Sequence, residues 1–270
     1  MATHHFNNTI LITGGAGFIG SNFIPFFLDK NPDIKVVNLD ILSYAGDLGN
    51  LKEVEKHPNY TFVKGDICDN LLVKGLFENH NISGVINFAA ESHVDNSINS
   101  PSQFIKTNIE GTFNLLENAR IFWNGENNRF HHISTDEVFG SLGENGFFTE
   151  KSSYQPNSPY SASKASSDFR SYYHTYGMNV VTSNCSNNYG PKQHDEKLIP
   201  TIIRSAINGV KIPIYGNGKN IRDWLFVNDH CVGIDSIYHK GKAGETYSLG
   251  GNNEYDNCWG EGHPNIRMVI

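Results

Sequence analysis

The sequence predicts an α/β protein built on a doubly wound parallel sheet, with a smaller C-terminal lobe. Short apolar runs typical of buried strands recur through the first two thirds of the chain, and segments with helical apolar spacing lie between them. This alternation favours a parallel sheet whose ligand crevice lies at the carboxyl ends of the strands. With 270 residues, 38% of them hydrophobic, the chain can form a large core and a small lobe. We place the first domain at residues 1–183 and the second at residues 184–270.

A glycine-rich turn follows the first predicted strand, residues 10–13. The segment Gly14-Gly15-Ala16-Gly17-Phe18-Ile19-Gly20 then leads into residues with helical apolar spacing. Gly14 permits a tight turn, and Gly17 lets the backbone approach a pyrophosphate. Gly20 allows helix and strand to pack closely, with the helix N-terminus facing the phosphates. This strand-turn-helix pattern predicts a dinucleotide site.

The second predicted strand, residues 35–40, ends in an acid that narrows the choice of dinucleotide. Asp40 can accept hydrogen bonds from an adenosine ribose and would repel a 2′-phosphate. We therefore expect NAD rather than NADP as the cofactor. A glycine pattern alone is weak evidence, so this prediction rests on the turn and the acid together.

Later predicted strands also end in small or polar residues. We expect strands at residues 60–64, 84–88 and 130–134, the last followed by Thr135-Asp136-Glu137. Acids in this position lie where a parallel sheet opens onto its ligand crevice, although an arbitrary Asp-Glu pair more often begins a solvated loop. Helical spacing over residues 96–120 predicts a long helix that could pack on another subunit.

The helix predicted at residues 160–176 carries Tyr160 and Lys164 one turn apart, so both side chains leave the same face. A nearby ammonium lowers the pKa of a phenol, which makes Tyr160 a candidate proton acceptor from a sugar hydroxyl. A Tyr-x-x-x-Lys pair alone is common on helix surfaces. Downstream of an NAD-type turn, and with Thr135 supplying a hydroxyl, it is the pattern of the short-chain dehydrogenase superfamily.

The last third of the chain has a different pattern of predicted elements. Residues 184–191 form a polar segment that predicts a turn, and a helix is expected around residues 202–208. Residues 212–216 and 220–227 predict short strands or loops. These elements suit a small lobe that closes over a ligand.

Composition limits the classes of partner. The chain has 21 basic and 28 acidic residues, so no general basic field is expected to attract nucleic acid or an anionic membrane. The N-terminus lacks a signal-peptide pattern, and no run has the length of a membrane span. Four widely spaced cysteines favour reduced thiols and a cytoplasmic protein. His131 and His132 would point to opposite sides of a strand, so we expect no metal site.

Four segments together resemble the dTDP-glucose 4,6-dehydratase family of the extended short-chain dehydrogenases. They are NFAAESHVD at residues 87–95, STDEVFG at 134–140, YSASK at 160–164 and NCSNNYGP at 184–191. The resemblance covers residues 10–257 and implies a Rossmann-like domain, NAD as cofactor, and dehydration of dTDP-glucose by internal hydride transfer from C4 to C6. It implies that Glu137 is the base at C5 and Asp136 the acid at C6. The 4-epimerases lack this acid and base pair, because they only move hydride to and from one carbon.

The same resemblance implies the residues of both binding sites. The cofactor site would comprise Gly14, Gly17, Phe18, Ile19, Gly20, Asp40, Asp66, Ile67, Ala89, Ala90, Thr107, Tyr160, Lys164 and Asn188. The nucleotide-sugar site would comprise Ser92, Thr135, Asn187, Lys197, Leu198, Pro213, Tyr215, Arg222 and Asn257. Lys197 and Arg222 would supply the local cations that a diphosphate needs in an acidic chain. The alternative for Arg222 is a salt bridge with Asp223.

Residues 258–270 have no helical periodicity and look unlike the family. We interpret them as a premature end, as from a frameshift or a truncation, which would leave the nucleotide-sugar lobe at residues 184–270 incomplete. The shortened C-terminus makes a catalytically inactive NAD-binding protein one alternative. Two others stay open: a UDP-glucose 4,6-dehydratase, because the base pocket cannot be read from the sequence, and a nucleotide-sugar 4-epimerase. The resemblance also implies a homodimer formed by helices at residues 103–120 and 160–176. Its candidate contact residues are Phe104, Phe113, Phe169 and Tyr173.

Overall fold

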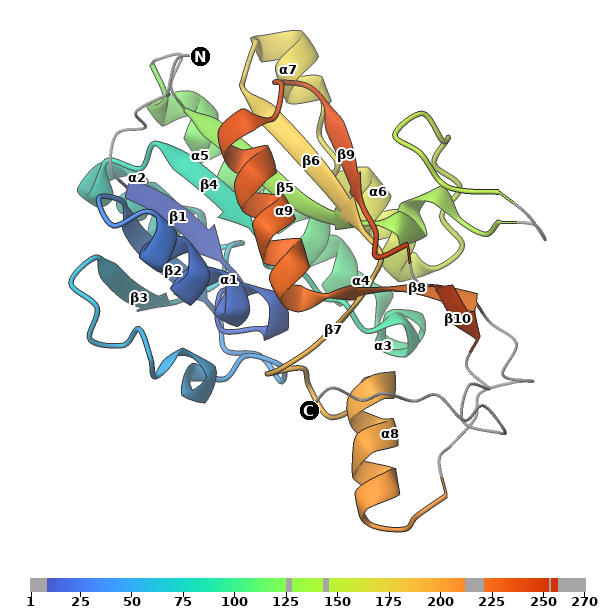
Figure 1. Cartoon of the computed structure of the whole chain (residues 1–270). Coiled ribbons are helices and arrows are strands. Elements are labelled where there is room, and N and C mark those ends of the chain that lie inside the picture. The colour runs from blue at the N-terminus through green and yellow to red at the C-terminus, as the bar shows by residue number, and fades with distance from the viewer. Residues whose placement is uncertain (1–8, 125–127, 143–145, 212–220, 253, 257–270) are drawn as a thin grey trace.

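A seven-stranded sheet, parallel throughout, forms the centre of the molecule (Figure 1). Its strands are β1 Thr9–Thr13, β2 Lys35–Asp40, β3 Tyr60–Lys64, β4 Gly84–Asn87, β5 Arg129–Thr135, β6 Val180–Cys185 and β9 Thr246–Leu249. They lie in the order β3-β2-β1-β4-β5-β6-β9. The order reverses direction between β1 and β4, which is where a doubly wound sheet opens its ligand crevice. The computed structural model describes residues 9–124, 128–142, 146–211, 221–252 and 254–256.

Helices cover both faces of this sheet and bury one apolar cluster on each. The covering helices are α1 Phe18–Lys30, α2 Asn70–His80, α5 Thr112–Phe122 and α9 Val227–Lys240. Phe27 of α1 and Tyr238 of α9 share one cluster with Ile10 of β1. Leu11, the next residue of β1, belongs to the other cluster, with α2 and α5, because successive strand residues point to opposite faces. The predicted doubly wound α/β fold is therefore confirmed.

Two long predicted helices are broken in the structure. The remaining helical segments are η1 Leu48–Leu51, α3 Val94–Asn99, α4 Pro101–Phe104, the π-helical η2 Ile105–Gly111, the 3₁₀ helix η3 Asp136–Phe139, α6 Pro159–Ser167, α7 Ser171–Tyr176 and α8 Leu198–Ile207. The segment at 96–120 breaks at Ser100, because Pro101 takes the first position of a new helix. The segment at 160–176 breaks after Ser167, where Asp168 leaves helical geometry and its carboxylate accepts a hydrogen bond from Tyr154 Oη.

A second, three-stranded sheet lies beside the first. It comprises β7 Asn187–Tyr189, β8 Ile221–Phe226 and β10 Glu254–Asp256, with β8 parallel to β7 and antiparallel to β10. The segment at 184–191, predicted as a turn, instead contributes to β6 and β7. Neither α9 nor β9 was anticipated, and the strand expected at 212–216 lies outside the described residues. The division after residue 183 stays a prediction: β6 passes through it, and α9 and β9 return to the large sheet.

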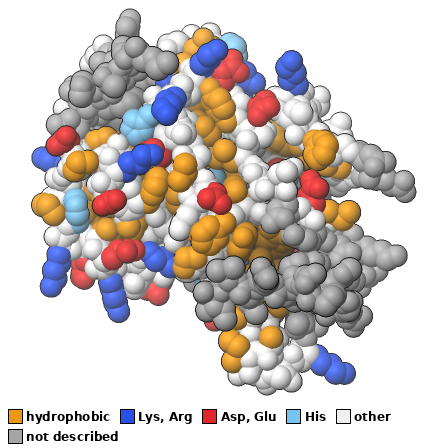
Figure 2. Space-filling model, in the orientation of Figure 1, with side chains coloured by type: hydrophobic (Ala, Val, Ile, Leu, Met, Phe, Trp, Pro, Cys, Tyr) orange, Lys and Arg blue, Asp and Glu red, His pale blue; other side chains and the backbone are white. Residues whose placement is uncertain are grey.

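The face that carries α1 and α9 mixes acidic and basic side chains in its described part, as Figure 2 shows. This agrees with the modest formal net charge of −7. Among the described residues, no helix combines the length and the apolar character that crossing a membrane requires.

Gly20→Ala should destabilise the protein, because a Cβ there would lie 2.5 Å from Gly14 O and 2.7 Å from Gly15 Cα. These backbone atoms cannot move without separating α1 from the turn, so we expect a loss of about 1–3 kcal/mol. Gly75→Ala in α2 is the matched control, since its Cβ would meet only Asn79 Nδ2 at 4.0 Å. It should be neutral or stabilise by about 0.5–1 kcal/mol. Denaturant titration compares the two, and unchanged stability in Gly20→Ala would contradict the packing argument.

Candidate active site

Thr135 ends β5, and the chain turns at once into η3, which carries both predicted acids. The Thr135 hydroxyl oxygen accepts a hydrogen bond from Glu137 N at 3.2 Å, and the hydroxyl donates to Asp136 Oδ1 at 3.3 Å. Val138 and Phe139, the next two residues, are buried and anchor the turn. Local sequence thus places Asp136 and Glu137 at the carboxyl end of the sheet, where a ligand crevice is expected.

The two acids differ in their electrostatic surroundings. Burial, and next the negative charge of Glu137, raise the pKa of Asp136 to about 6. Burial also raises the pKa of Glu137, but the positive charges of Arg222 and Lys197 oppose this rise. Neighbouring carboxyls in unlike surroundings can divide the roles of acid and base. Asp136 is placed to hold a proton and Glu137 to remain ionised.

Helix α6 brings Tyr160 to the same site. Its first turn is fixed by a capping box between Ser158 and Ser161, with Pro159 at the first helical position. The Tyr160 ring is buried against Phe104, with ring centroids 6.3 Å apart. The Thr135 side chain acts on the Tyr160 phenol in the direction that lowers its pKa. The structure therefore brings together the hydroxyl and the phenol that the sequence predicts as partners.

Lys164 lies in the site, but the pKa of Tyr160 is raised and not lowered. Its Nζ donates to Ile133 O at 2.8 Å and lies 3.3 Å from His132 Nε2. Burial lowers the pKa of Lys164 to about 8. Burial, and next the charge of Glu137, hold the pKa of Tyr160 well above its usual value. The net shift is opposite to the lowering expected beside an ammonium, because burial is its largest cause.

The glycine turn has the shape that a dinucleotide diphosphate needs. Gly14 has φ +69°, and a Cβ there would collide with the backbone of Ala89. At Gly17 a Cβ would meet only Gly14 O, at 3.4 Å, so the first turn of α1 is open on that side. Among the described residues, no side chain caps the N-terminus of α1, which leaves backbone N–H groups for an anion. These residues fit a bound NAD.

Other predicted cofactor residues lie on strand ends, on α1, on η2 and on β7, and several make structural hydrogen bonds of their own. Asp40 accepts from Ala16 N and from Leu42 N, each at 2.8 Å, which ties the glycine turn to β2. Asp66 accepts from Cys68 N, and Asn188 is held between Ser186 O and His230 Nδ1. Half-buried residues complete the set: Phe18, Ile19, Ala89, Ala90 and Thr107, with Ile67 fully buried.

The predicted nucleotide-sugar residues are only partly within the described chain. Lys197 Nζ donates to Ser92 O at 3.4 Å, and Leu198 begins α8. Arg222 on β8 lowers the pKa of both acids, whereas Asp223 accepts from Gly251 N at 2.7 Å. This geometry favours Arg222 as a cation of the site over a salt bridge with Asp223. Asn187 lies on β7, while Pro213, Tyr215 and Asn257 lie outside the described residues.

Two residues beside Lys164 were missed by sequence reasoning. His132 on β5 and Asp168 after α6 are both buried, and their Nε2 and Oδ1 atoms lie 3.4 Å apart. His131 points to the other face of the sheet, where its Nε2 contacts Ser183 Oγ at 2.9 Å. The spacing of Lys164 and Asp168, one helical turn, is the signal that could have found the acid. Within the described ranges, no three His, Cys, Asp or Glu side chains are placed to share a metal ion.

Comparison with known proteins agrees with this geometry. The family model described as GDP-mannose 4,6 dehydratase matches residues 11–260. The dTDP-glucose 4,6-dehydratase of Xanthomonas campestris pv. campestris (strain B100) is 54% identical over 257 residues, which cover 92% of this chain and 73% of that protein. The Streptomyces venezuelae dTDP-glucose 4,6-dehydratase structure with NAD and TYD bound has a TM-score of 0.88 at 46% identity, covering 93% and 78% of the two chains. The Thermotoga maritima UDP-glucose 4-epimerase has a TM-score of 0.84 at 26% identity, covering 93% and 79%.

The sheet order, the glycine turn and the Thr135, Tyr160 and Lys164 set define an extended short-chain dehydrogenase that acts on nucleotide sugars. Within this class, the adjacent acids after Thr135 and the 54% identity narrow the assignment. The chain belongs to the dTDP-glucose 4,6-dehydratase family.

Asp136→Asn should make the folded protein more stable at neutral pH. A carboxyl whose pKa rises on folding, here from 3.8 to about 6, stabilises the fold only while it is protonated. That contribution is present below pH 3.8 and is lost as the pH rises through about 6, whereas asparagine stays neutral. The Tm advantage of the variant should therefore be larger at pH 8 than at pH 5. Asp29→Asn, at an exposed position of α1, is the control, and an equal advantage at both pH values would contradict the buried-acid argument.

Proposed function

We propose that the protein catalyses the NAD-dependent dehydration of dTDP-glucose to dTDP-4-keto-6-deoxyglucose, as a hydro-lyase of deoxysugar biosynthesis. Family membership and the named activity of the 54% identical relative support the reaction class. The observation that carries the proposal is the adjacent pair Asp136 and Glu137, held in unlike electrostatic surroundings beside Tyr160. Hydride transfer alone would need no such pair.

The glycine turn, Asp40 and the strand-end residues around them would hold the cofactor. Gly17 and the uncapped start of α1 suit the diphosphate, and Asp40 suits an adenosine ribose. Bound NAD would supply a hydride acceptor for C4, a hydride donor for C6 and a positively charged ring. Lys164 and Tyr160 lie on the first turns of α6, from which both can reach toward the reacting end.

The residues of the chain would supply every proton transfer. Tyr160 would act as the phenolate, a form that the positively charged ring of bound NAD would favour against the effect of burial. It would take the proton of the C4 hydroxyl as that carbon becomes a ketone, which acidifies the hydrogen at C5. Glu137 removes the C5 proton, and Asp136 gives its proton to the C6 hydroxyl, which leaves as water. Glu137 then returns its proton to C5 as hydride reaches C6. Substrate thus becomes product plus water, and Tyr160 and Asp136 recover their starting states by exchange with solvent.

The nucleotide would be held from the second sheet and α8. The positive charges of Arg222 and Lys197 lower the pKa of Glu137. As local cations on an acidic chain, they would also attract a diphosphate. The preference for thymidine over uridine rests on the names of the relatives. UDP-glucose is therefore the first alternative substrate to test.

Glu137→Gln should lower kcat for dehydration by roughly a hundred- to ten-thousand-fold, because it removes a positioned base. NAD and dTDP-glucose should still bind, and C4 oxidation should still occur. Asp136→Asn is the matched variant, since it blocks loss of the C6 hydroxyl and leaves the base intact. Mass spectrometry of substrate recovered from D₂O should show deuterium at C5 with Asp136→Asn and none with Glu137→Gln.

Equal exchange at C5 in both variants would show that the acid and the base are assigned wrongly. An epimerised, non-dehydrated product from the native chain would indicate a 4-epimerase instead. If dTDP-glucose and UDP-glucose both give no product while calorimetry detects NAD binding, the protein is an inactive NAD-binding member of the family. If only UDP-glucose gives product, the substrate is UDP-glucose and the proposed dehydration reaction is unchanged.

A homodimer is proposed through the helical segments α4 to α5 and α6 to α7. Phe113 on α5 and Tyr173 on α7 are 49% and 37% exposed, which suits an interface. Phe104 is fully buried against Tyr160, and Phe169 is partly buried in the core, so neither can contribute much. Other exposed apolar residues on these segments are Ile105, Ile121 and Tyr176.

Phe113→Glu should shift the protein from dimer to monomer, because a carboxylate would be desolvated at the centre of the proposed contact. Light scattering at micromolar concentration measures the mass of each variant. Leu71→Glu on α2 is the control, since Leu71 is 82% exposed and lies outside the proposed interface. A native chain that is already monomeric would contradict the dimer.

A cytoplasmic location is also proposed. Cys68, Cys185 and Cys231 are free thiols, which suit a reducing compartment. We also propose that the chain forms two lobes and that residues after 183 bind the nucleotide sugar.

A further inference from the structure

A buried polar network lies beside Lys164, and the proposed proton transfers do not use it. His132 Nε2 is 3.3 Å from Lys164 Nζ, 3.2 Å from Ser167 Oγ and 3.4 Å from Asp168 Oδ1. The His132 and Asp168 side chains are only 3% and 1% exposed. A buried carboxylate is costly unless it is paired, so Asp168 needs an explanation.

Contacts from the neighbouring strands hold the His132 ring in place. The Thr13 hydroxyl donates to Asn87 Oδ1 at 2.6 Å, and the Asn87 amide nitrogen lies 3.2 Å from His132 Nδ1. Burial, and next the charge of Lys164, hold the pKa of His132 well below its usual value, so the ring is neutral. Its Nε2 atom lies between Lys164, Ser167 and Asp168.

Lys164 needs a negative charge, because its described hydrogen bond to Ile133 O supplies only a dipole. Two groups raise the pKa of Lys164 against the effect of burial, Asp168 and Cys185. Burial raises the pKa of the Cys185 thiol to about 12, so this thiol is uncharged at neutral pH. Asp168 is thus the carboxylate that compensates Lys164 among the described residues. We propose that Asp168 is a positioning residue, the buried counter-ion that holds Lys164 charged and in place across His132.

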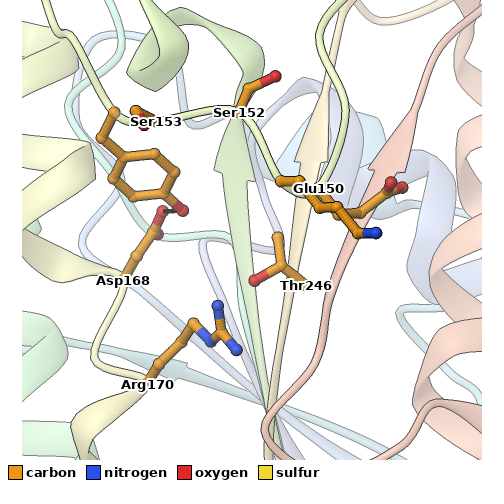
Figure 3. A pocket seen from close by; sticks show the side chains of 8 residues that line it. Glu150, Ser152, Ser153, Asp168, Arg170 and Thr246 are labelled. Atoms are coloured by element: carbon orange, nitrogen blue, oxygen red, sulfur yellow. Dashed lines mark hydrogen bonds between the residues drawn. The ribbon is translucent and has the colours of Figure 1, made fainter.

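Asp168 also lines a pocket of about 570 Å³ (Figure 3). Tyr154 Oη donates to Asp168 Oδ2 at 2.7 Å, while Arg170 and Thr246 line the same pocket. Burial raises the pKa of Asp168 to about 6, opposed by the Tyr154 hydrogen bond and by Lys164. Because the pKa of Lys164 is about 8, both groups are charged between about pH 6 and 8.

The inference rests on the proposed function only where it gives Lys164 a catalytic role. We therefore test the ion pair first without substrate, by following the Lys164 side chain in ¹³C-lysine NMR of the full chain and assigning its signal with Lys164→Arg. Asp168→Asn should lower the titration midpoint of Lys164 by about one to three pH units. Tyr154→Phe is the matched control, because it removes a hydrogen bond to Asp168 and keeps the carboxylate. Its effect on Lys164 should be smaller than that of Asp168→Asn, because it raises the pKa of the carboxyl but does not remove the group.

The same variants should change the pH profile of dehydration if the proposed function holds. With Asp168→Asn, the fall of kcat/KM at high pH should begin at lower pH, because Lys164 loses its proton sooner. If Asp168 has only a structural role, Asp168→Asn should lower kcat/KM at every pH and leave the pH at which it begins to fall unchanged. An inactive native chain would refute the proposed function, yet the NMR titration would still decide the ion pair.

A thermal double-mutant cycle covers the case in which Asp168→Asn folds poorly. With Lys164→Met already present, Asp168→Asn should lower Tm less than it does in the native chain, since no ammonium is left unpaired. Asp168→Glu, which keeps the charge, should fold better than Asp168→Asn. Additive Tm losses, an unmoved Lys164 titration, or equal failure of the Glu and Asn variants would each overturn the counter-ion assignment.

Discussion

The fold depends at its centre on one run of buried hydrogen bonds that crosses the carboxyl ends of three neighbouring strands. Thr13 of β1 donates to Asn87 of β4, and the Asn87 amide contacts His132 of β5. Each of these side chains is at most 2% exposed, so each bond replaces one that water would otherwise make. The same run fixes the strand register beneath the glycine turn and the orientation of the imidazole beside Lys164. These bonds thereby hold the glycine turn and helix α6 in fixed positions relative to each other.

Charge burial is the constraint that organises the rest of the site. The acids after β5, the ammonium of Lys164 and the carboxylate of Asp168 all lie where water is largely excluded, so none can be ionised without a partner. Separate elements supply these charged partners. Arg222 on β8 and Lys197 at the start of α8 act on Glu137, and Asp168 after α6 acts on Lys164. Sites with such opposing environments are where proton transfer at neutral pH becomes feasible.

Much of the fold could be predicted because its signals are local. The glycine turn, the strand that ends at Asp40, and the acids after Thr135 each combine a short apolar run with the residues at its end. The break after Ser167 could not be predicted, because it depends on a contact between Asp168 and Tyr154 across 14 positions. The same holds for His132, whose partners come from β4 and α6. Helix α9 was missed because polar residues such as Asn228 and Asp229 obscure its apolar face.

The position of α9 also has a consequence for how the chain folds during synthesis. Ile234 and Tyr238 complete the same apolar cluster as Ile10 and Phe27, more than two hundred residues earlier in the chain. Strands β1 to β6 can pair as they emerge from the ribosome, and α1 can cover part of this face, yet the part that α9 covers stays open until the segment Val227–Lys240 has been made. The nascent chain therefore carries an open apolar surface through most of translation, and closure of the core is among the last steps of folding.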